Sequence, residues 1–158
     1  LPVCVGMALA GKMNHQNYRV YTVMGDGELA EGSVWEGAMS AAHYKLDNLC
    51  AVVDRNRLQI SGNTEDVMHH DDLHERFRSF GWHVIDVKNG NSIEELDAAF
   101  EEAKTVKGKP TVLIANTVKG CGSSVMENKA SWHHHVPGDE EYEQIMKDLE
   151  ERKEAALK

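Results

Sequence analysis

Residues 19–56, RVYTVMGDGELAEGSVWEGAMSAAHYKLDNLCAVVDRN, decide the fold of this chain. The apolar run at 19–24 predicts a buried strand, and the GDG sequence at 25–27 ends it because glycine permits a sharp turn. Apolar residues at helical spacing predict an amphipathic helix from about 33 to 45, and the run at 49–56 predicts a second strand. A strand, a helix and a strand in this order indicate a parallel pair of strands joined by a crossover helix.

The remainder of the chain repeats this alternation. Apolar spacing predicts helices over 2–13 and from about 72 to a stop signal at Gly81, and Ser92 with Glu95 three residues later predicts a capped helix start. Further strands are predicted at 82–87 and 110–117. We therefore expect an α/β fold with a mostly parallel sheet, helices on both faces, and ligand binding at the carboxyl ends of the strands.

The composition along the chain predicts where the domain ends and a C-terminal helix begins. We expect residues 1–138 to belong to this domain and residues 139–158 to form a separate, largely polar C-terminal helix with acidic residues in its first turn. Leu1 stands inside an apolar, small-residue stretch, LPVCVGMALAG, that is typical of a helix already under way. We therefore expect the domain to be incomplete at its N-terminus.

Composition excludes several classes of protein. With 158 residues, 41% of them hydrophobic and 27% charged, the chain has the make-up of one globular domain. Its net charge of −9 argues against nucleic acids and anionic membranes as partners, since both require clustered Lys and Arg, and no apolar run approaches about 18 residues. Three widely spaced cysteines without a C-x-x-C pair favour neither a disulfide framework nor a cysteine zinc site, and we expect a cytoplasmic location.

Two polar residues mark a candidate metal site. Asp26 ends the first strand of the opening segment and Asn56 ends the second, so both reach the same edge of a parallel sheet. A carboxylate, an amide oxygen and a nearby main-chain carbonyl suit Mg²⁺ or Ca²⁺, and Mg²⁺ completes its octahedron with phosphate oxygens and water. These residues therefore predict a diphosphate ligand, although a GDG sequence alone also fits an ordinary turn.

The sequence from 25 to 62 resembles the thiamine diphosphate motif of transketolases, in which GDG opens the segment and an asparagine closes it. The resemblance extends from Leu1 to about Pro137 through FRSFGWHVIDVKNGN and KGKPTVLIANTVKGCGS, and it is closest to the N-terminal subunit of two-subunit transketolases. It implies the thiamine diphosphate-binding fold and transfer of a two-carbon ketol unit between sugar phosphates, a reaction of the pentose phosphate pathway. It also implies a partner, the C-terminal subunit with the pyrimidine domain and its catalytic glutamate, and at least two copies of each subunit.

The resemblance assigns ligands at matching positions. Asp26, Asn56 and the main-chain carbonyl of Leu58 would bind the metal. The backbone of Gly25 and Gly27 and the side chain of Asn56 would contact the cofactor diphosphate. The same resemblance implies cofactor-contacting histidines and a glycine-rich loop upstream of Leu1, so this chain would hold only part of the site.

Three further residues have both a functional and a plain interpretation. By the resemblance, Glu31 would be a catalytic residue, matching an acidic residue at the subunit interface that links two active sites. It also fits a solvated carboxylate at a helix start. Ile60 would lie near the thiazolium ring or in the core. Lys119 would meet a diphosphate or sugar phosphate, or lie in solvent.

Histidines offer several candidates. KGCGSSVMENKASWHHH resembles a family segment in which the histidine after tryptophan faces the diphosphate and donor sugar, which selects His133 as a catalytic and cofactor-binding residue. His134 and His135 depart from the usual glycine-rich continuation, so the sequence leaves open which of the three faces the site. A zinc tract is the weaker alternative for this triplet, because no acidic or cysteine ligands accompany it. His69 and His70 are expected to be solvated or to cap a helix.

The sequence also allows three other functions. Deoxyxylulose phosphate synthase and 2-oxo acid dehydrogenase components share GDG and the closing asparagine, but the Trp132-His133 pair and YKLDNL at 44–49 favour transketolase. The chain could also be a truncated binding module that keeps the metal half-site and never catalyses alone. A nucleotide-binding domain ranks last because the phosphate-binding glycine motifs of such domains are absent from the sequence.

Overall fold

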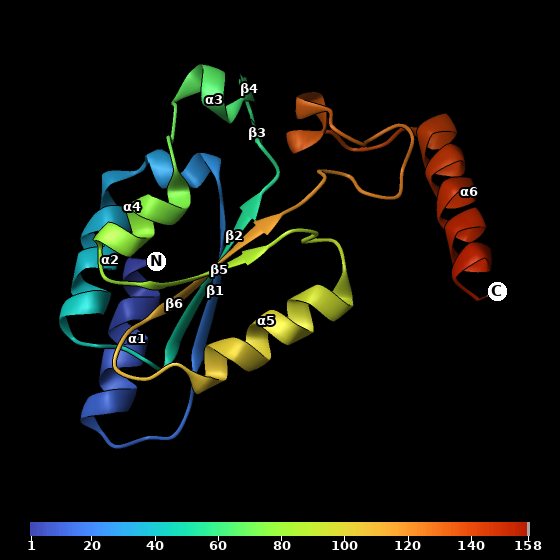
Figure 1. Ribbon diagram of the computed structural model, residues 1–158. Helices are drawn as coiled ribbons and strands as arrows, with labels where there is room; N and C mark the ends of the chain where they lie inside the picture. Colours follow the sequence, from blue (N-terminus) through green and yellow to red (C-terminus); the bar gives the residue numbers. More distant parts are fainter. Residues whose placement is uncertain (158) are drawn as a thin grey trace.

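The computed structural model describes residues 1–157 and contains a four-stranded parallel sheet in the order β1-β2-β6-β5 (Figure 1). Its strands are β1 (Val20–Gly25), β2 (Leu49–Arg55), β5 (His83–Val87) and β6 (Thr111–Asn116). Gly25 lies opposite Asp54 in the register of β1 with β2, and Asp54 lies opposite Ala115 in that of β2 with β6. The predicted strands and their parallel arrangement are confirmed, with ends shifted by a residue or two.

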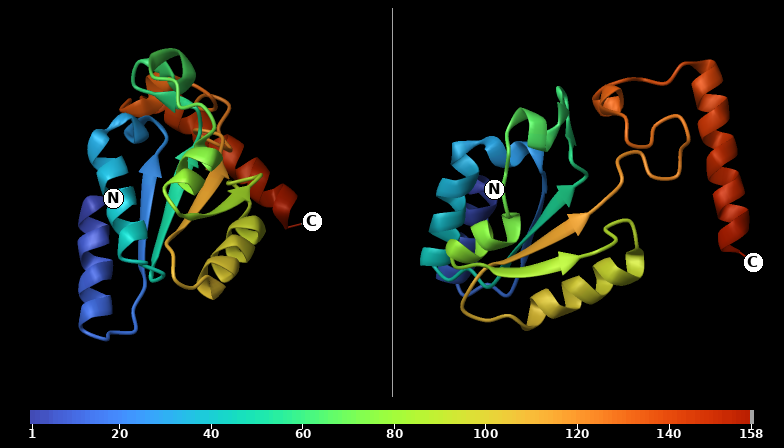
Figure 2. Two further views of the ribbon diagram at one scale, coloured as in Figure 1. Left: turned by 60° about the vertical axis from the view of Figure 1, so that its left-hand side comes forward. Right: turned by 45° about the horizontal axis from the view of Figure 1, so that its top comes forward.

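Helices cover both faces of this sheet, as expected. On one face lie α1 (Pro2–Met13), α2 (Gly32–His43) and α4 (Leu73–Ser79), and on the other lies α5 (Ile93–Thr105) (Figure 2). Alternate residues of β2 point to opposite faces, so that Leu49, Ala51 and Val53 pack with α1, α2 and α4, whereas Cys50 and Val52 pack toward α5. This two-sided burial explains why the central strands are continuous apolar runs.

Aromatic rings fill the core beneath α4. Phe77 is fully buried, and its ring centroid lies 5.2 Å from that of Trp35 and 5.6 Å from that of Trp82. The indole N–H of Trp82 donates to the carbonyl of Ala38 at 3.0 Å, so the ring is buried with its polar atom satisfied. These contacts join α2, α4 and the start of β5 into one packed layer.

β1 lies at the end of the sheet and is less covered than the other strands. Its outer edge has no neighbouring strand within residues 1–157. On the face that α5 partly covers, Val23 is 71% exposed and Tyr21 is 46% exposed, although the Tyr21 ring contacts Phe100 of α5 edge-on at 5.7 Å.

Several short elements were not predicted from the sequence. They are η1 (Gly27–Ala30), the hairpin of β3 (Leu58–Gln59) and β4 (Gly62–Asn63), α3 (Thr64–Val67) and η2 (Ala130–His133). Elements of two to four residues are too short to show a hydrophobic period, so the pattern predicts only loops there. The last helix, α6 (Asp139–Ala156), extends beside the main body, and none of its residues is buried (Figure 2).

The start of α5 differs in detail from the predicted capping box. The Ser92 hydroxyl accepts from the backbone N–H of Glu95 at 3.3 Å, as predicted. The Glu95 carboxylate, however, accepts from the backbone N–H of Asn89 at 2.9 Å, because the chain before the helix curls back toward it. The cap is therefore shared with the preceding turn.

One prediction about the paired histidines is wrong. His69 is exposed and pairs with Glu65 and Asp71, but His70 is only 2% exposed, and its Nε2 has no hydrogen-bond partner. The connection between α3 and α4 turns His70 inward, and its polar neighbours in sequence gave no sign of this burial. Within residues 1–157 no helix is long and apolar enough to cross a membrane.

We predict that Phe77→Ala lowers the free energy of unfolding by about 3–5 kcal/mol, because it removes a buried ring and leaves a cavity. Urea denaturation followed by circular dichroism measures this loss. Ile93→Ala is the control, since Ile93 is 79% exposed and its truncation should change stability by less than about 0.5 kcal/mol. Similar losses in both variants would contradict the position of Phe77 in the core.

We also predict that His70→Leu raises the free energy of unfolding by about 1 kcal/mol, because it removes a buried nitrogen that lacks a hydrogen-bond partner. The same denaturation experiment applies, with His69→Leu as the exposed control that should give no gain. A loss of stability in His70→Leu would mean that the imidazole makes a favourable interaction in solution.

Candidate functional site

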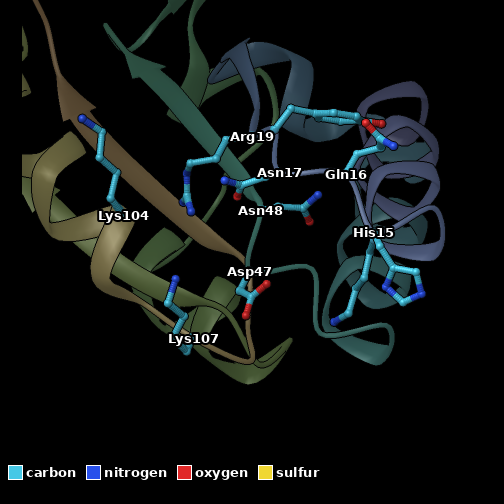
Figure 3. A pocket seen from close by; sticks show the side chains of 10 residues that line it. His15, Gln16, Asn17, Arg19, Asp47, Asn48, Lys104 and Lys107 are labelled. Atoms are coloured by element: carbon cyan, nitrogen blue, oxygen red, sulfur yellow. The ribbon is translucent and has the colours of Figure 1, made fainter.

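A basic hollow lies at the amino-terminal edge of the sheet, with a volume of about 640 Å³ (Figure 3). Two of its basic side chains donate hydrogen bonds to backbone carbonyls of the domain. Lys12 donates to the carbonyls of Tyr44 and Lys45, and Arg19 donates to the carbonyl of Ala103 at 3.1 Å. Because these side chains fasten loops and the C-terminal end of α5, we assign this hollow a structural role.

The candidate site is a second cavity of about 670 Å³ at the carboxyl edge of the sheet. All nine residues selected from the sequence line it, although they come from separate parts of the chain. These residues are Gly25, Asp26, Gly27, Glu31, Asn56, Leu58, Ile60, Lys119 and His133. The alternation of strands and helices therefore brings the selected residues together at the expected edge.

Asp26 is the buried acid of this cavity, with 2% of its surface exposed. Its Oδ1 accepts from the N–H of Gly27 at 2.9 Å, and its Oδ2 accepts from the N–H of Arg57 at 2.6 Å. Burial raises the pKa of the Asp26 carboxyl, the two backbone hydrogen bonds oppose that rise, and the nearby Asp54 carboxylate adds to it. The position disfavours negative charge, so a bound cation would stabilise the ionised carboxylate.

The turn after β2 places Asn56 and the backbone that follows it. Arg57 has a φ of 65°, in the left-handed region, and its N–H donates to Asp26 Oδ2. The Asn56 Oδ1 accepts from the N–H of Leu58 at 2.9 Å, forming a local side-chain turn. Its Nδ2 donates to Asp54 Oδ1 at 3.3 Å.

Four further residues line the cavity that the sequence did not single out, namely Glu28, Asp54, Gln59 and Ser61, and two of them have polar contacts or burial of interest. Asp54 accepts from the Asn56 amide and from the Thr117 hydroxyl, so it joins the ends of β2 and β6. An acidic residue two positions before Asn56 was a visible signal in the sequence. Gln59 has a buried Oε1 without a hydrogen-bond partner, and no sequence pattern indicated its inward position.

The β3–β4 hairpin forms one wall and explains the glycine at position 27. A Cβ at Gly27 would lie 2.9 Å from the Cβ of Gln59, so a larger residue would displace the hairpin. Ile60 is 64% exposed and lines the cavity, so the alternative of a core role for Ile60 is wrong. Glu31 is exposed at the start of α2 and lines the same cavity.

The structure distinguishes the three consecutive histidines. His133, on η2, lines the cavity. His135 instead pairs with Glu141 of α6 at 2.9 Å, and its ring packs edge-on against Trp132. Because of the pair with Glu141, His135 joins η2 to α6, and His133 is the member of the triplet at the site.

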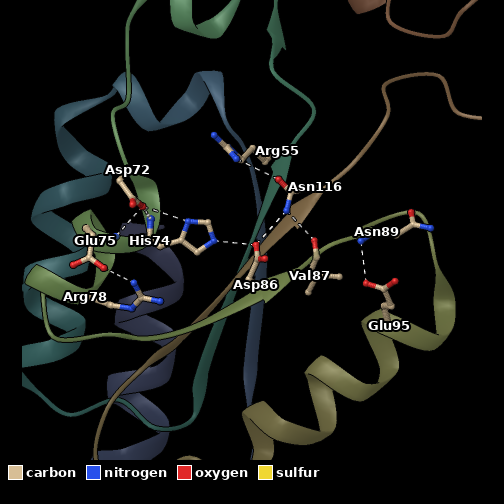
Figure 4. A network of polar contacts seen from close by, with 10 residues as sticks. All are labelled: Arg55, Asp72, His74, Glu75, Arg78, Asp86, Val87, Asn89, Glu95 and Asn116. Carbon is tan, nitrogen blue, oxygen red and sulfur yellow. Dashed lines mark hydrogen bonds and ion pairs between the residues drawn. The ribbon is translucent and has the colours of Figure 1, made fainter.

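A polar network supports the edge from behind (Figure 4). The His74 Nε2 lies 2.9 Å from Asp86 Oδ1, and Asn116 Nδ2 donates to the same oxygen at 3.2 Å. The Asn116 Oδ1 accepts from Arg55 at 3.3 Å. The network links α4, β5, β6 and β2 and holds the strand end that precedes Asn56.

Comparison with known proteins identifies relatives. The family model described as "Transketolase, thiamine diphosphate binding domain" matches residues 4–155. One subunit of the apulose-4-phosphate transketolase of Phocaeicola vulgatus is 48% identical over 152 residues, which cover 96% of this chain and 54% of that protein. The 6-deoxy-6-sulfo-D-fructose transketolase subunit SqwG of a Clostridium species is 40% identical over 146 residues, which cover 92% of this chain and 53% of that protein.

The fold has similar counterparts among solved structures. The transketolase of Campylobacter jejuni superposes with a TM-score of 0.86 at 29% identity, covering 92% of this chain and 24% of that one. This chain spans about half the length of the transketolase subunits that it matches. Because the family model covers nearly all of the chain and the fold agrees, the chain belongs to the thiamine diphosphate binding domain family of transketolases.

Proposed function

We propose that this chain is the diphosphate-binding part of the N-terminal subunit of a two-subunit transketolase, which transfers a two-carbon ketol unit between sugar phosphates. The observation that carries the proposal is the convergence of the nine selected residues in one cavity at the carboxyl edge. Three relatives are named as single subunits of transketolases, which supports the two-subunit organisation. The family match favours a transketolase over the other thiamine diphosphate enzymes considered from the sequence.

The donor set fits a hard divalent cation. The Asp26 carboxylate, the Asn56 amide oxygen and the Leu58 carbonyl belong to residues that line the same cavity, and oxygen ligands of this kind suit Mg²⁺ or Ca²⁺. Among residues 1–157, no group of three or more His, Cys, Asp or Glu side chains is arranged to hold a metal ion. These three oxygen donors are fewer than an octahedral site needs, which suits Mg²⁺ because that ion also takes phosphate oxygens and water.

In this proposal, five residues bind the cation and the diphosphate of the cofactor. Thiamine diphosphate supplies the ring that stabilises the carbanion in ketol transfer. Asp26 and Asn56 hold the cation, and the backbone of Gly25 and Gly27 approaches the phosphates. Lys119 balances their negative charge.

The remaining residues act near the reacting end of the site. Ile60 gives an apolar surface for the thiazolium ring. His133 donates a hydrogen bond to the diphosphate or the donor sugar, and Glu31 contributes to the contact between subunits.

Partners complete the site in this proposal. A C-terminal subunit with a pyrimidine domain supplies the glutamate that activates the cofactor, and two copies of each subunit form the working enzyme. The substrates in this proposal are sugar phosphates. One relative is named for apulose 4-phosphate and another for the sulfonated sugar 6-deoxy-6-sulfofructose. The pentose phosphate pathway and the cytoplasmic location stay predictions.

We predict that Asp26→Ala abolishes magnesium-dependent binding of thiamine diphosphate while the fold is retained, because the variant lacks the buried carboxylate of the cation site. Isothermal titration calorimetry with and without Mg²⁺ measures binding, first on the chain and then on its complex with the C-terminal subunit. Asp97→Ala, on the exposed side of α5, removes the same charge elsewhere and should bind normally. Normal affinity in Asp26→Ala would refute the metal assignment.

We predict that His133→Ala slows turnover of the donor sugar in the reconstituted enzyme, whereas His134→Ala leaves it close to normal. His135→Ala should chiefly lower the melting temperature, because it removes the contact with Glu141. Steady-state kinetics and thermal denaturation measure these effects. Equal loss of turnover in all three variants would contradict the assignment of His133.

A further inference from the structure

The segment that carries Lys119 is a compact loop, residues 118–129, which we call the Lys119 loop. It is closed by its own hydrogen bonds. The N–H of Asn128 donates to the carbonyl of Lys119 at 3.0 Å, and the N–H of Glu127 donates to that of Ser123 at 3.0 Å. The Glu127 carboxylate also accepts from the N–H of Gly122 at 2.8 Å. These bonds join the two sides of the loop, so a displacement of its outer side would also displace Lys119.

Close backbone packing stiffens the Lys119 loop further. Gly120 has a φ of 69°, and a Cβ at this position would lie 2.8 Å from the backbone carbonyl carbon of Met126. The two sides of the loop are therefore in direct contact. Ser123 is buried within it.

Helix α6 fastens the outer side of this loop. The Asp148 Oδ2 accepts from both the N–H and the hydroxyl of Ser124, each at 2.6 Å. Four residues further along α6, the Arg152 guanidinium donates to the Cys121 sulfur at 3.2 Å. The hydrogen bonds from Ser124 hold the pKa of the Asp148 carboxyl below its usual value, so it is ionised at neutral pH.

The apolar core gives the loop little support on this side. A cavity of about 470 Å³ separates the strand ends from α6, with Asn56 and Lys119 among its lining on one side and Ile145 and Leu149 of α6 on the other. The start of the loop is attached to the domain, because the Val118 N–H donates to the Asn91 Oδ1 at 2.7 Å, whereas its outer side depends on the hydrogen bonds to α6.

We infer that α6 positions Lys119 for the cofactor diphosphate, with Asp148 and Arg152 as positioning residues that act through the Lys119 loop. The inference rests on the proposed function, because the diphosphate is the ligand assigned to Lys119. It gives α6, which contributes no buried residue to the domain, a role in ligand selection.

Hydrogen exchange tests the attachment itself, without the cofactor. Asp148→Ala should increase exchange of the Ser124 amide and of its neighbours in the loop by about fivefold or more, the effect of one net hydrogen bond. Glu151→Ala removes an exposed carboxylate from the same helix and should leave the loop unchanged. Unchanged exchange in Asp148→Ala would overturn the inference.

The second measurement compares affinities for thiamine diphosphate and thiamine monophosphate, by calorimetry on the complex with the C-terminal subunit. Lys119→Ala and Asp148→Ala should each reduce the preference for the diphosphate by roughly threefold to tenfold. Their double variant should lose no more than Lys119→Ala alone, because both act on one contact. Asp148→Asn, which keeps one acceptor oxygen, should retain part of the preference.

The outcomes separate the inference from the proposed function. A parent complex that binds both compounds equally contradicts the proposed role of the cavity in diphosphate binding. A parent complex with a normal preference that Asp148→Ala leaves intact refutes only the positioning role, even if loop exchange has increased. Equal melting temperatures in Asp148→Ala and Glu151→Ala would exclude general destabilisation as the cause of a lost preference.

Discussion

The parallel pairing of β1 with β2 is the constraint on which the site depends. In this register Gly25 lies opposite Asp54, and the N–H of Asp26 donates to the Asp54 carbonyl at 3.2 Å. Asp26 and Asn56 therefore leave their strands side by side. A slip of one residue would turn every β2 side chain to the opposite face, and the two-sided apolar core around β2 prevents it.

This arrangement places an acid where burial opposes its charge. Asp26 lies beside a second carboxylate, and its hydrogen bonds to two backbone N–H groups compensate only part of the desolvation. A buried, ionised carboxylate of this kind destabilises the domain when no cation is bound. For the same reason it favours the binding of a cation. The stability of the rest of the fold, above all the aromatic layer around Phe77, makes such a site tolerable.

The sequence predicted the sheet well because strands buried on both faces have long apolar runs, and glycine, proline and serine mark their ends. It predicted the cavity because Asp26 and Asn56 follow strands and parallel strands end at one edge. It could not predict the β3–β4 hairpin, whose strands have two residues each, and so it missed the inward Gln59. His70 was misjudged because its burial arises from the path of the chain after α3, which polar neighbours do not reveal.

The order of the site residues along the chain has a consequence for folding. Asp26, Asn56 and Ile60 belong to a single strand, helix and strand unit with its hairpin, whereas Lys119 and His133 come from far later in the sequence. Closing the shorter loop costs less entropy, so the metal half of the cavity should form first. During synthesis from the N-terminus, that half would leave the ribosome and assemble while Lys119 and His133 were still being added.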